Sequence, residues 1–296
     1  MNDFTQSTLL EINNWLEREL QQTIELSFVV FNPDNHPKAK GYKIWVNLAE
    51  LHFCKMLTPQ IIDEDKVKMS FKKLQQEASF HLKNIQDKKE KYGKDSLFFE
   101  IQKNEEPTFL LAYKRALEAV KVQNRKHILN LGINKGDEFE LIQKTVDKED
   151  FEKIKFSGID HSQTALNFAK ERFPQSNVTF YQHDINELST LNLEKADLIV
   201  SIGTLQSPEI NYKPFLMSLV QKYLSFDGAF ILGFPNGRWM DNELIYGAKA
   251  PNYPYSEMSL LYNDVIFAKK YLQQKKFRVT ITGREYIFLT ATRIGI

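Results

Sequence analysis

The chain contains a single cysteine, and this scarcity limits the chemistry open to it. Cys54 is the only thiol in 296 residues, which excludes an internal disulfide and any cysteine-based metal site. It lies in an apolar run between Phe53 and Met56, where we expect a small core residue rather than a nucleophile. No metal site is predicted.

Long apolar runs and an excess of charge are also missing. A membrane span needs about 20 consecutive apolar residues, and no run approaches that length. The sequence opens without the basic and then apolar pattern of a signal peptide. The net charge is +1, so net charge indicates no class of partner. We expect a cytoplasmic protein that does not bind membranes, and the sequence predicts no oligomeric state.

Lysines are concentrated in residues 66–94, which contain nine of them and only three acidic residues, Glu77, Asp87 and Glu90. Such a run could attract phosphate groups. Nucleic-acid surfaces usually add arginine and interleaved aromatic residues, and these are scarce here. We therefore interpret the lysines as charges that favour solubility, and a nucleic-acid partner is disfavoured.

From residue 127 onward, β-rich runs alternate with helical patterns. Strands are expected at 128–131, 156–160, 178–182, 197–202, 229–234, 278–282 and 286–292. Helical spacing relates the apolar residues between them: Phe139, Ile142 and Val146; Ala165, Phe168 and Ala169; Phe215, Leu219 and Val220; Leu261, Val265, Ala268 and Leu272. The first five runs predict a buried parallel sheet. The last two are separated only by a short turn at Gly283, so they must pair antiparallel.

The N-terminal third lacks that alternation. We expect a helix at 9–20, strands at 25–31, 42–48 and 67–74, and loops at 63–68 and 87–94. A helix should start at Pro107 and carry the apolar stripe Phe109, Tyr113, Ala116, Leu117 and Val120. The expected fold class is α/β. Residues 107–296 should form a doubly wound, seven-stranded, mostly parallel sheet that ends in an antiparallel hairpin. Residues 1–106 should form an α+β accessory region that caps the substrate.

One βαβ unit points to a ligand. The strand at 128–131 runs into a turn with Gly132 and Gly136, a helix follows, and the next strand stops at Asp160. The glycines let the backbone approach a ligand, and an acid at the end of the second strand can accept hydrogen bonds from a ribose diol. The sequence therefore predicts a nucleoside-bearing cofactor.

Four places in residues 107–296 resemble the class I S-adenosylmethionine-dependent methyltransferases. The family's loop acidic-x-Gly-x-Gly-x-Gly reads Asn130-Leu-Gly132-Ile-Asn134-Lys-Gly136 here, and its ribose-binding acid corresponds to Asp160. The acidic and apolar pair that brackets adenine corresponds to Asp184-Ile185, and the strand beneath the methyl donor to residues 196–203. The terminal hairpin is a further mark of the family.

The loop departs from the family pattern at two residues. Asn130 replaces the usual acid, and its carbonyl can still bind an amino group without a full charge. Asn134 replaces the middle glycine, and asparagine tolerates the left-handed conformation better than other residues with a side chain. These departures keep open the alternative of an inactive, methyltransferase-like binding protein.

The resemblance implies S-adenosyl-L-methionine as cofactor and assigns a set of cofactor-binding residues. Asp160 is preferred as a ribose ligand because Ser162 can cap the following helix instead. Asp184 is preferred at the adenine over the role of an ordinary strand-end acid. A sulfonium donor is already activated, so no catalytic residue is assigned. The full predicted set is Asn130, Gly132, Asn134, Gly136, Asp160, His161, Asp184, Ile185, Ser201, Ile202 and Gly203.

An unusually long connection follows the fifth strand. Residues 236–255 exceed the 2–6 residues common for such links, and they are rich in aromatic side chains. Because loops at the carboxyl ends of parallel strands bind ligands, we expect a substrate lid. The alternative is packing against the N-terminal region. The predicted substrate residues are Arg238, Trp239, Tyr246, Tyr253 and Tyr255.

The segment after the fourth strand limits the acceptor. Ser201 to Ser207 lacks the Asp/Asn-Pro-Pro-aromatic motif of base-amino methyltransferases, and no suitable cysteine supports carbon-5 pyrimidine methylation. Methyl transfer to oxygen, nitrogen or carbon of a small molecule is favoured, with a tRNA or protein acceptor as the alternative. A nicotinamide oxidoreductase is disfavoured because the loop does not fit Gly-x-Gly-x-x-Gly.

Overall fold

The computed structural model describes residues 1–75, 92–207, 209–241, 243–246 and 257–295. The chain divides into two compact units. The smaller one comprises Met1–Ala78 with Trp239–Ile245, and the larger one comprises Ser79–Arg238 with Tyr246–Ile296. Each unit is described by itself. Among the described residues, no helix is both long and apolar enough to span a membrane.

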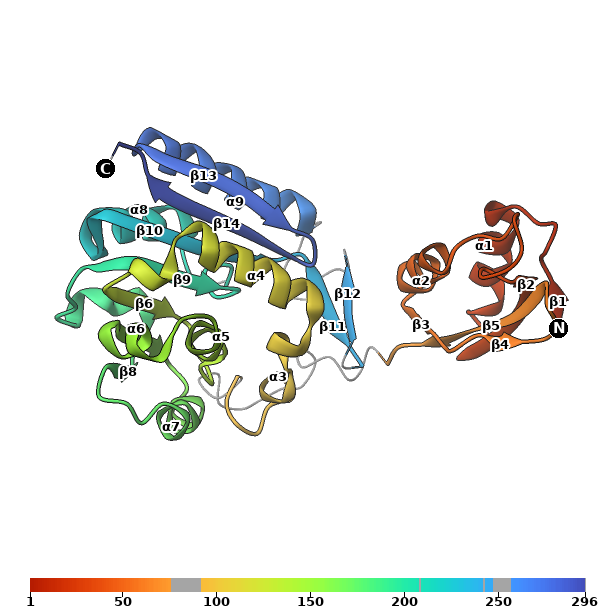
Figure 1. Cartoon of the computed structure of the whole chain (residues 1–296), viewed down its shortest axis with the longest axis horizontal. Coiled ribbons are helices and arrows are strands. Elements are labelled where there is room, and N and C mark those ends of the chain that lie inside the picture. The colour runs from red at the N-terminus through yellow and green to blue at the C-terminus, as the bar shows by residue number, and fades with distance from the viewer. Residues whose placement is uncertain (76–91, 208, 242, 247–256, 296) are drawn as a thin grey trace. The chain divides into compact units, whose positions relative to one another are not determined.

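Residues 1–75 of the smaller unit form an α+β structure with one sheet and two helices (Figure 1). Its sheet has the order β1-β2-β5-β3, with β4 paired to β5, and β2 and β5 are antiparallel. Aromatic rings of Phe28, Trp45 and Phe71 fill the core between sheet and helices. Cys54 is buried there, as expected of a core residue. The elements are β1 (Asn2–Asp3), α1 (Leu9–Glu19), β2 (Glu25–Phe31), α2 (Tyr42–Leu51), β3 (Cys54–Met56), β4 (Gln60–Ile61) and β5 (Lys66–Lys73).

The strand expected at 42–48 is wrong, because these residues begin helix α2. Ile44 and Val46, which favoured a strand, are exposed. Trp45, Leu48 and Ala49 are buried instead, and their spacing of three and four residues defines one face of a helix. The loop expected at 63–68 is also shorter, since β5 starts at Lys66.

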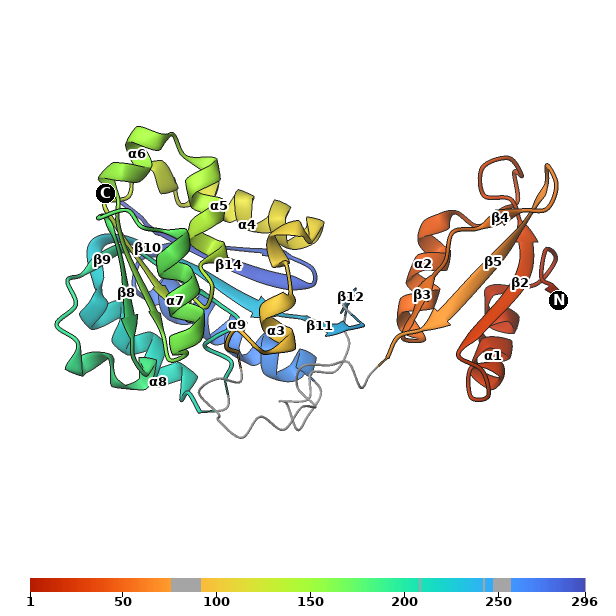
Figure 2. The same cartoon turned by 90° about the horizontal axis from the view of Figure 1, so that it is seen from below.

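The larger unit is built on a seven-stranded sheet with the order β13-β14-β10-β9-β6-β7-β8 (Figures 1 and 2). Strands β6 to β10 pair in parallel, while β14 is antiparallel to both β10 and β13. This confirms the predicted fold class and the terminal hairpin. The strands are β6 (His127–Leu131), β7 (Lys155–Asp160), β8 (Val178–Gln182), β9 (Ala196–Ile202), β10 (Leu224–Pro235), β13 (Phe277–Gly283) and β14 (Tyr286–Arg293).

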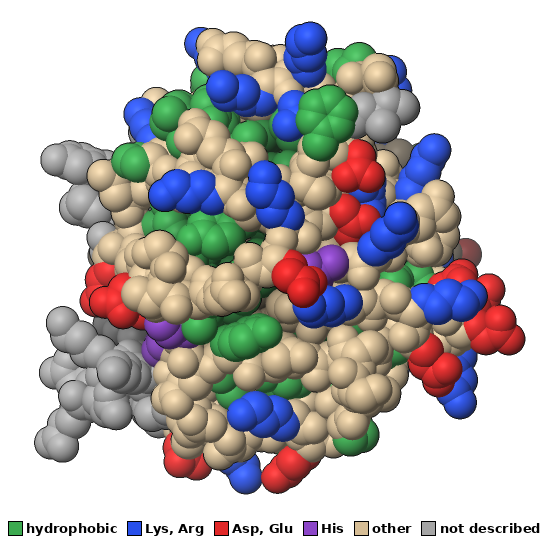
Figure 3. Space-filling view, turned by 90° about the vertical axis from the view of Figure 1, so that its left-hand side faces the viewer, with side chains coloured by type: hydrophobic (Ala, Val, Ile, Leu, Met, Phe, Trp, Pro, Cys, Tyr) green, Lys and Arg blue, Asp and Glu red, His purple; other side chains and the backbone are tan. Residues whose placement is uncertain are grey.

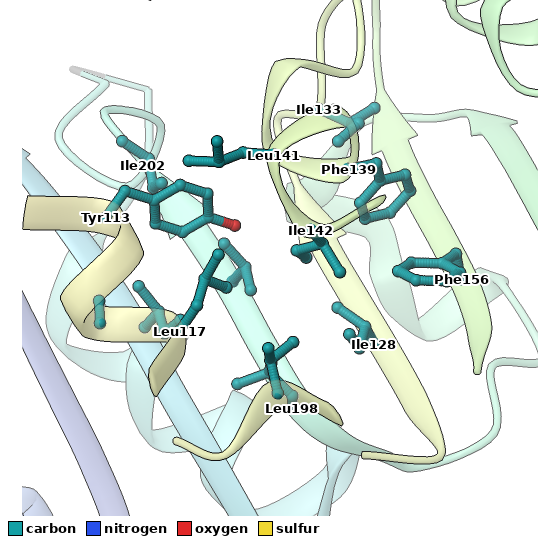
Figure 4. Packing of buried hydrophobic residues seen from close by; sticks show 14 of the residues in the cluster. Tyr113, Leu117, Ile128, Ile133, Phe139, Leu141, Ile142, Phe156, Leu198 and Ile202 are labelled. Atoms are coloured by element: carbon teal, nitrogen blue, oxygen red, sulfur yellow. The ribbon is translucent and has the colours of Figure 1, made fainter. Parts of the chain in front are cut away.

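Helices cover both faces of this sheet, each over its own hydrophobic core. On one face α4, α5, α6 and α7 pack over side chains such as Ile128 and Phe156, and Figure 4 shows this core at the level of α4 and α5. On the other face η5, α8 and α9 pack over Leu129 and Phe230. The stripe predicted from Phe109 to Val120 is buried in the first core. The helical segments are α3 (Leu97–Glu100), η3 (Lys103–Glu105), α4 (Pro107–Ala119), η4 (Val122–Asn124), α5 (Asp137–Thr145), α6 (Lys148–Lys153), α7 (Gln163–Arg172), η5 (Ile185–Thr190), α8 (Tyr212–Ser218), η6 (Leu219–Tyr223) and α9 (Glu257–Gln274).

The connection after β10 contains a hairpin that the sequence did not reveal. Strand β11 (Gly237–Met240) pairs with β12 (Glu243–Tyr246) in a separate two-stranded sheet. Asp241 lies at the turn with φ +47°. The expected loop at 236–255 is therefore a β-hairpin in its first half, while residues 247–256 lie outside the described part of the chain.

Candidate functional site

The candidate site lies where β6 and β7 end, at the carboxyl edge of the parallel sheet. Strand order reverses at this point, since β6 is flanked by β7 on one side and by β9 on the other. Ligands bind at such switch points in open α/β sheets. The loop after β6, residues 132–136, is called the glycine loop below.

Backbone conformation explains the two glycines of this loop. Gly132 and Gly136 have φ of +76° and +87°, a region that other residues rarely adopt. A Cβ on Gly132 would lie 2.0 Å from Thr204 Oγ1, so glycine lets the segment after β9 approach the loop. A Cβ on Gly136 would lie 2.6 Å from the Phe173 ring. Both positions therefore require glycine.

Asn134 takes the left-handed conformation that its glycine counterpart would take, with φ +47°. Its backbone N–H donates to Asp160 Oδ2 at 2.8 Å. Its side-chain Nδ2 donates to the Tyr92 carbonyl at 2.7 Å. The residue is buried, and the hydrogen bond to Asp160 is buried with it, while the one to Tyr92 is partly buried. Asn134 thus joins the end of β7 to a segment that precedes the sheet.

Asp160 ends β7 and is 6% exposed. Besides Asn134, the Ser162 N–H donates to its other oxygen, Oδ1, at 2.9 Å. A carboxylate offers about four acceptor positions, so two hydrogen bonds leave capacity for a ligand diol. Helix α7 is capped by Ser162, whose hydroxyl accepts from the Ala165 N–H at 3.2 Å. The predicted division between a helix cap at Ser162 and a free role for Asp160 is consistent with this geometry.

Asn130 is fully buried near the end of β6, and neither polar atom of its side chain has a hydrogen-bonding partner among the residues that the structure describes. An unsatisfied buried polar group costs about 1–3 kcal/mol. A structure keeps such a group when a ligand or water completes its hydrogen bonds. Asn130 therefore marks a place where an external polar group fits.

The residues after β7 and β8 have local partners of their own. His161 Nδ1 lies 4.0 Å from Asp160 Oδ1, and the side chain is 42% exposed. Asp184 is exposed, and its Oδ1 accepts from the Asn186 N–H at 2.8 Å, which caps η5. Ile185 beside it is buried. His183 contacts Thr190 Oγ1 at 2.9 Å, so its ring packs locally against η5.

The end of β9 lies against the glycine loop. Ser201 donates its hydroxyl to the Leu131 carbonyl at 3.1 Å, and Ile202 packs into the first core. Gly203 has φ +74°, and its N–H donates to the Gly233 carbonyl at 2.9 Å. The structure therefore brings the predicted residues of β6, β7 and β9 to one edge.

A segment that sequence reasoning missed crosses this edge. Residues 92–105, called the strap below, precede α4 and include α3 and η3. The Lys94 N–H donates to Thr164 Oγ1 at 2.9 Å, in the first turn of α7. Lys135 Nζ of the glycine loop donates to the carbonyls of Phe99 and Ile101, both at 2.7 Å. The strap is thus anchored to the glycine loop after β6 and to the first turn of α7, the helix that follows β7.

A buried ion pair fixes the end of the strap. Lys103 Nζ lies 2.6 Å from Glu138 Oε1, and their side chains are 14% and 1% exposed. Burial alone would lower the pKa of the Lys103 ammonium, but Glu138 and Asp137 raise it overall. Tyr113 of α4 is fully buried, and burial, with Glu138 adding to it, raises the pKa of its hydroxyl. Figure 4 shows that hydroxyl directed from α4 toward α5.

The predicted substrate residues are described only in part. Arg238 and Trp239 are half-buried in β11, and Tyr246 ends β12. Tyr253 and Tyr255 lie outside the described residues. Within the smaller unit, Lys55 Nζ lies 3.8 Å from Asp241 Oδ2 and 3.2 Å from Glu243 Oε1. The hairpin is therefore linked by charge to β3.

Comparison with known proteins assigns the part of the chain that forms this sheet to a domain family. A family model described as a methyltransferase domain matches residues 123–279, more than half of the chain. The chain belongs to the class I methyltransferase family. The methyltransferase uses S-adenosylmethionine as its methyl donor. A search of curated proteins gave no match.

Solved structures with similar folds are distant in sequence. One is a putative caffeoyl-CoA O-methyltransferase from Staphylococcus aureus, with 14% identity, a TM-score of 0.43, and coverage of 62% of this chain and 83% of that one. Another is an S-adenosylmethionine-dependent methyltransferase from Aquifex aeolicus, with 16% identity, a TM-score of 0.40, and coverage of 60% and 89%. The family assignment rests on the domain match.

The residues at the carboxyl edge fit this cofactor in their chemistry. The unpartnered amide of Asn130 suits an ammonium or carboxylate group, and the spare acceptor positions of Asp160 suit a diol. In the described part of the chain, no cluster of three or more potential ligands could hold a metal ion.

Proposed function

We propose that this methyltransferase methylates a small molecule at the carboxyl edge of its sheet. The observation that carries the proposal is the Asn130 amide near the end of β6, which is fully buried and has no partner in the described part of the chain. The neighbouring strand β7 ends in Asp160. Burying this amide without hydrogen bonds destabilises the free protein, and only a polar ligand that binds there would offset that cost.

The cofactor roles follow the chemistry of each side chain. Asp160 would accept hydrogen bonds from the two ribose hydroxyls. Asn130 would accept one from the methionine ammonium through Oδ1, without the full charge of the family's acid. Asp184 and Ile185 would flank the adenine, Asp184 through the oxygen that does not cap η5. Gly132, Asn134, Gly136, His161, Ser201, Ile202 and Gly203 would form the surrounding wall.

The bound cofactor supplies an electrophilic methyl group on a sulfonium whose thioether leaves as a neutral group. The protein's own contribution is to hold donor and acceptor in line and to exclude water, and orientation alone can supply several kcal/mol. Asp160 and Asn134 fix one end of that arrangement by their mutual hydrogen bond. We assign no general base.

A small acceptor is favoured over tRNA or protein. Ser201 to Ser207 offers no base-gripping motif, and the face of the larger unit in Figure 3 shows basic side chains scattered among acidic and apolar ones. Extended basic surfaces are what nucleic acids require. Arg238, Trp239, Tyr246, Tyr253 and Tyr255 remain the proposed acceptor contacts, and residues 1–106 the proposed cap.

Transfer of a labelled methyl group tests the proposal. Purified full-length protein would be incubated with methyl-labelled S-adenosylmethionine and, separately, with pooled small metabolites, total tRNA and a protein extract. Label in the small-molecule fraction supports the proposal. Label that appears only in tRNA or protein assigns the acceptor to the alternative class. A thermal-shift screen with S-adenosylmethionine, S-adenosylhomocysteine and NAD would separate a protein that binds without transfer from an oxidoreductase.

A further inference from the structure

We propose that Asn134 and Lys135 are positioning residues, which fasten the strap over the glycine loop and so couple strap docking to cofactor binding. The inference rests on the proposed cofactor site. It starts from two neighbouring residues of the glycine loop whose side chains both donate hydrogen bonds to the strap. Asn134 Nδ2 donates to the Tyr92 carbonyl, and Lys135 Nζ donates to the carbonyls of Phe99 and Ile101.

Asn134 has two separate tasks, one for its backbone and one for its side chain. Its φ of +47° favours glycine, asparagine or aspartate. Glycine would satisfy the backbone but offers no donor to Tyr92. Aspartate would direct an acceptor oxygen at the carbonyl oxygen of Tyr92. Of these three residues, asparagine alone keeps both the turn and the hydrogen bond.

The same residue links the strap to the ribose acid. The Asn134 backbone N–H holds Asp160 Oδ2 at 2.8 Å, while its side chain holds the strap at 2.7 Å. Release of the strap would free the Asn134 side chain and loosen the orientation of the Asp160 carboxylate. A carboxylate that is fixed in advance binds a diol at a lower entropic cost.

Lys135 provides the second anchor. Its side chain is 6% exposed, and Nζ lies 3.9 Å from Asp137 Oδ2, farther than from either strap carbonyl. Burial lowers the pKa of this ammonium, and the hydrogen bonds to the two strap carbonyls offset part of the free-energy cost of burying it. These carbonyls belong to the end of α3, where a cation is favoured. The strap is thereby tied down at both of its ends, near Tyr92 and near Ile101.

Contacts to the loop after β7 complete the span. The Tyr92 and His161 rings lie 6.5 Å apart, and the rings of Phe99 and Phe168 lie 5.2 Å apart in an edge-to-face arrangement. The strap therefore reaches from the glycine loop to α7, the two elements that bracket Asp160. A ligand bound to Asp160 would have the strap as one side of its site.

The decisive variant restores the residue that the family uses. If Asn134 is merely a tolerated replacement for glycine, Asn134→Gly should bind S-adenosylhomocysteine as well as the wild type or better. The attachment of the strap by Asn134 and Lys135, called the latch below, predicts roughly fivefold weaker binding from the loss of one hydrogen bond, about 1 kcal/mol. Asn134→Asp should bind more weakly still. Lys135→Met keeps the buried chain but loses two charged hydrogen bonds, and we expect roughly tenfold weaker binding.

Calorimetric titration with S-adenosylhomocysteine and hydrogen exchange of the strap, residues 92–105, without ligand are measured on the same full-length proteins. Lys170→Met, an exposed lysine on α7, is the matched control and should change neither. The latch also predicts faster exchange in the strap of Asn134→Gly and Lys135→Met. Because both residues hold one strap, the double variant should lose less than the sum of the single losses.

The outcomes separate this inference from the proposed function. Equal or tighter binding by Asn134→Gly, or unchanged strap exchange in both variants, overturns the latch. If the wild type does not bind the probe, the cofactor assignment and the coupling both fail. Strap exchange would then still decide whether the two side chains hold the strap.

Discussion

The Asn134 N–H and the Asp160 carboxylate are joined by a 2.8 Å hydrogen bond that ties the loop after β6 to the end of β7. The bond connects the residue where the glycine loop departs from its family to the acid that the family uses for ribose. It also lies below the protein surface, since both residues are buried. A polar contact of this kind fixes geometry more than it adds stability, because folding replaces a hydrogen bond to water.

Removal of the Asp160 carboxylate should weaken cofactor binding. Asp160→Ala leaves the N–H groups of Asn134 and Ser162 without their acceptor and removes the proposed ribose contact. We expect the binding free energy of S-adenosylhomocysteine, measured by calorimetric titration, to weaken by roughly 1–3 kcal/mol. Asp147→Ala is the control, because Asp147 is exposed and its side chain does not cap α6. Unchanged affinity in Asp160→Ala would remove Asp160 from the site.

Asn130→Leu should stabilise the free protein and weaken cofactor binding. Leucine has the same number and branching of side-chain heavy atoms as asparagine, although it is larger, and it removes two polar atoms that are buried without a partner among the described residues. We expect the free energy of unfolding to rise by about 1–3 kcal/mol, measured by urea denaturation, while affinity for S-adenosylhomocysteine falls.

Asn177→Leu is the matched control for this substitution. The Asn177 amide donates to the carbonyls of Phe151 and Ile154 at 2.7 and 2.8 Å. The same change there should therefore destabilise the protein. If Asn130→Leu destabilises it as well, a partner for the Asn130 amide exists in the folded protein and the argument from its isolation is wrong.

The sheet could be predicted from sequence because its signals are local and agree with one another. Each strand from β6 to β10 is a short apolar run bounded by turn residues, and Gly283 allows only an antiparallel hairpin. The N-terminal region gave weaker signals. Alternating apolar residues from Tyr42 favoured a strand, whereas burial of Trp45, Leu48 and Ala49 on one side produced α2. Tertiary packing decided that segment.

The candidate site could be predicted only where a residue type follows directly from its place in the fold. Asp160 and Gly132 stand at strand ends that the βαβ pattern locates. The strap could not be predicted in this way, because the partners of Lys103 and Lys135 lie more than 30 residues away in the chain. Asn134 was the one available signal. A side-chain donor where the family has glycine indicates that the side chain donates a hydrogen bond, although the sequence does not show to which acceptor.

Replacing one member of the Lys103–Glu138 pair should lower the free energy of unfolding more than replacing both members. Lys103→Met leaves the Glu138 carboxylate buried without its cation, and we expect a loss of about 3–5 kcal/mol in the free energy of unfolding. Adding Glu138→Gln to Lys103→Met should restore part of that loss. Urea denaturation of the two single variants and the double variant forms the cycle. Additive losses would show that the two side chains do not depend on each other.

Acidification below about pH 6.5 should destabilise the larger unit through His127. Burial lowers the pKa of this imidazole, whose Nε2 lies 2.9 Å from Ser157 Oγ and whose Nδ1 lies 3.2 Å from the Lys195 carbonyl. The folded state therefore keeps His127 neutral after the unfolded chain has begun to bind a proton, near pH 6.5. The stability is complete above that pH and is lost below it, by up to about 1.4 kcal/mol per pH unit.

Urea denaturation at intervals between pH 7.5 and 5.5 measures this slope. His127→Gln should be less stable than the wild type at pH 7.5, because it loses the buried ring contacts. The difference should shrink as the pH falls, because glutamine binds no proton in either state. His161→Gln controls for the removal of a histidine from the same unit. A difference between His127→Gln and the wild type that stays constant over this range would mean that His127 is protonated equally in the folded and unfolded chains.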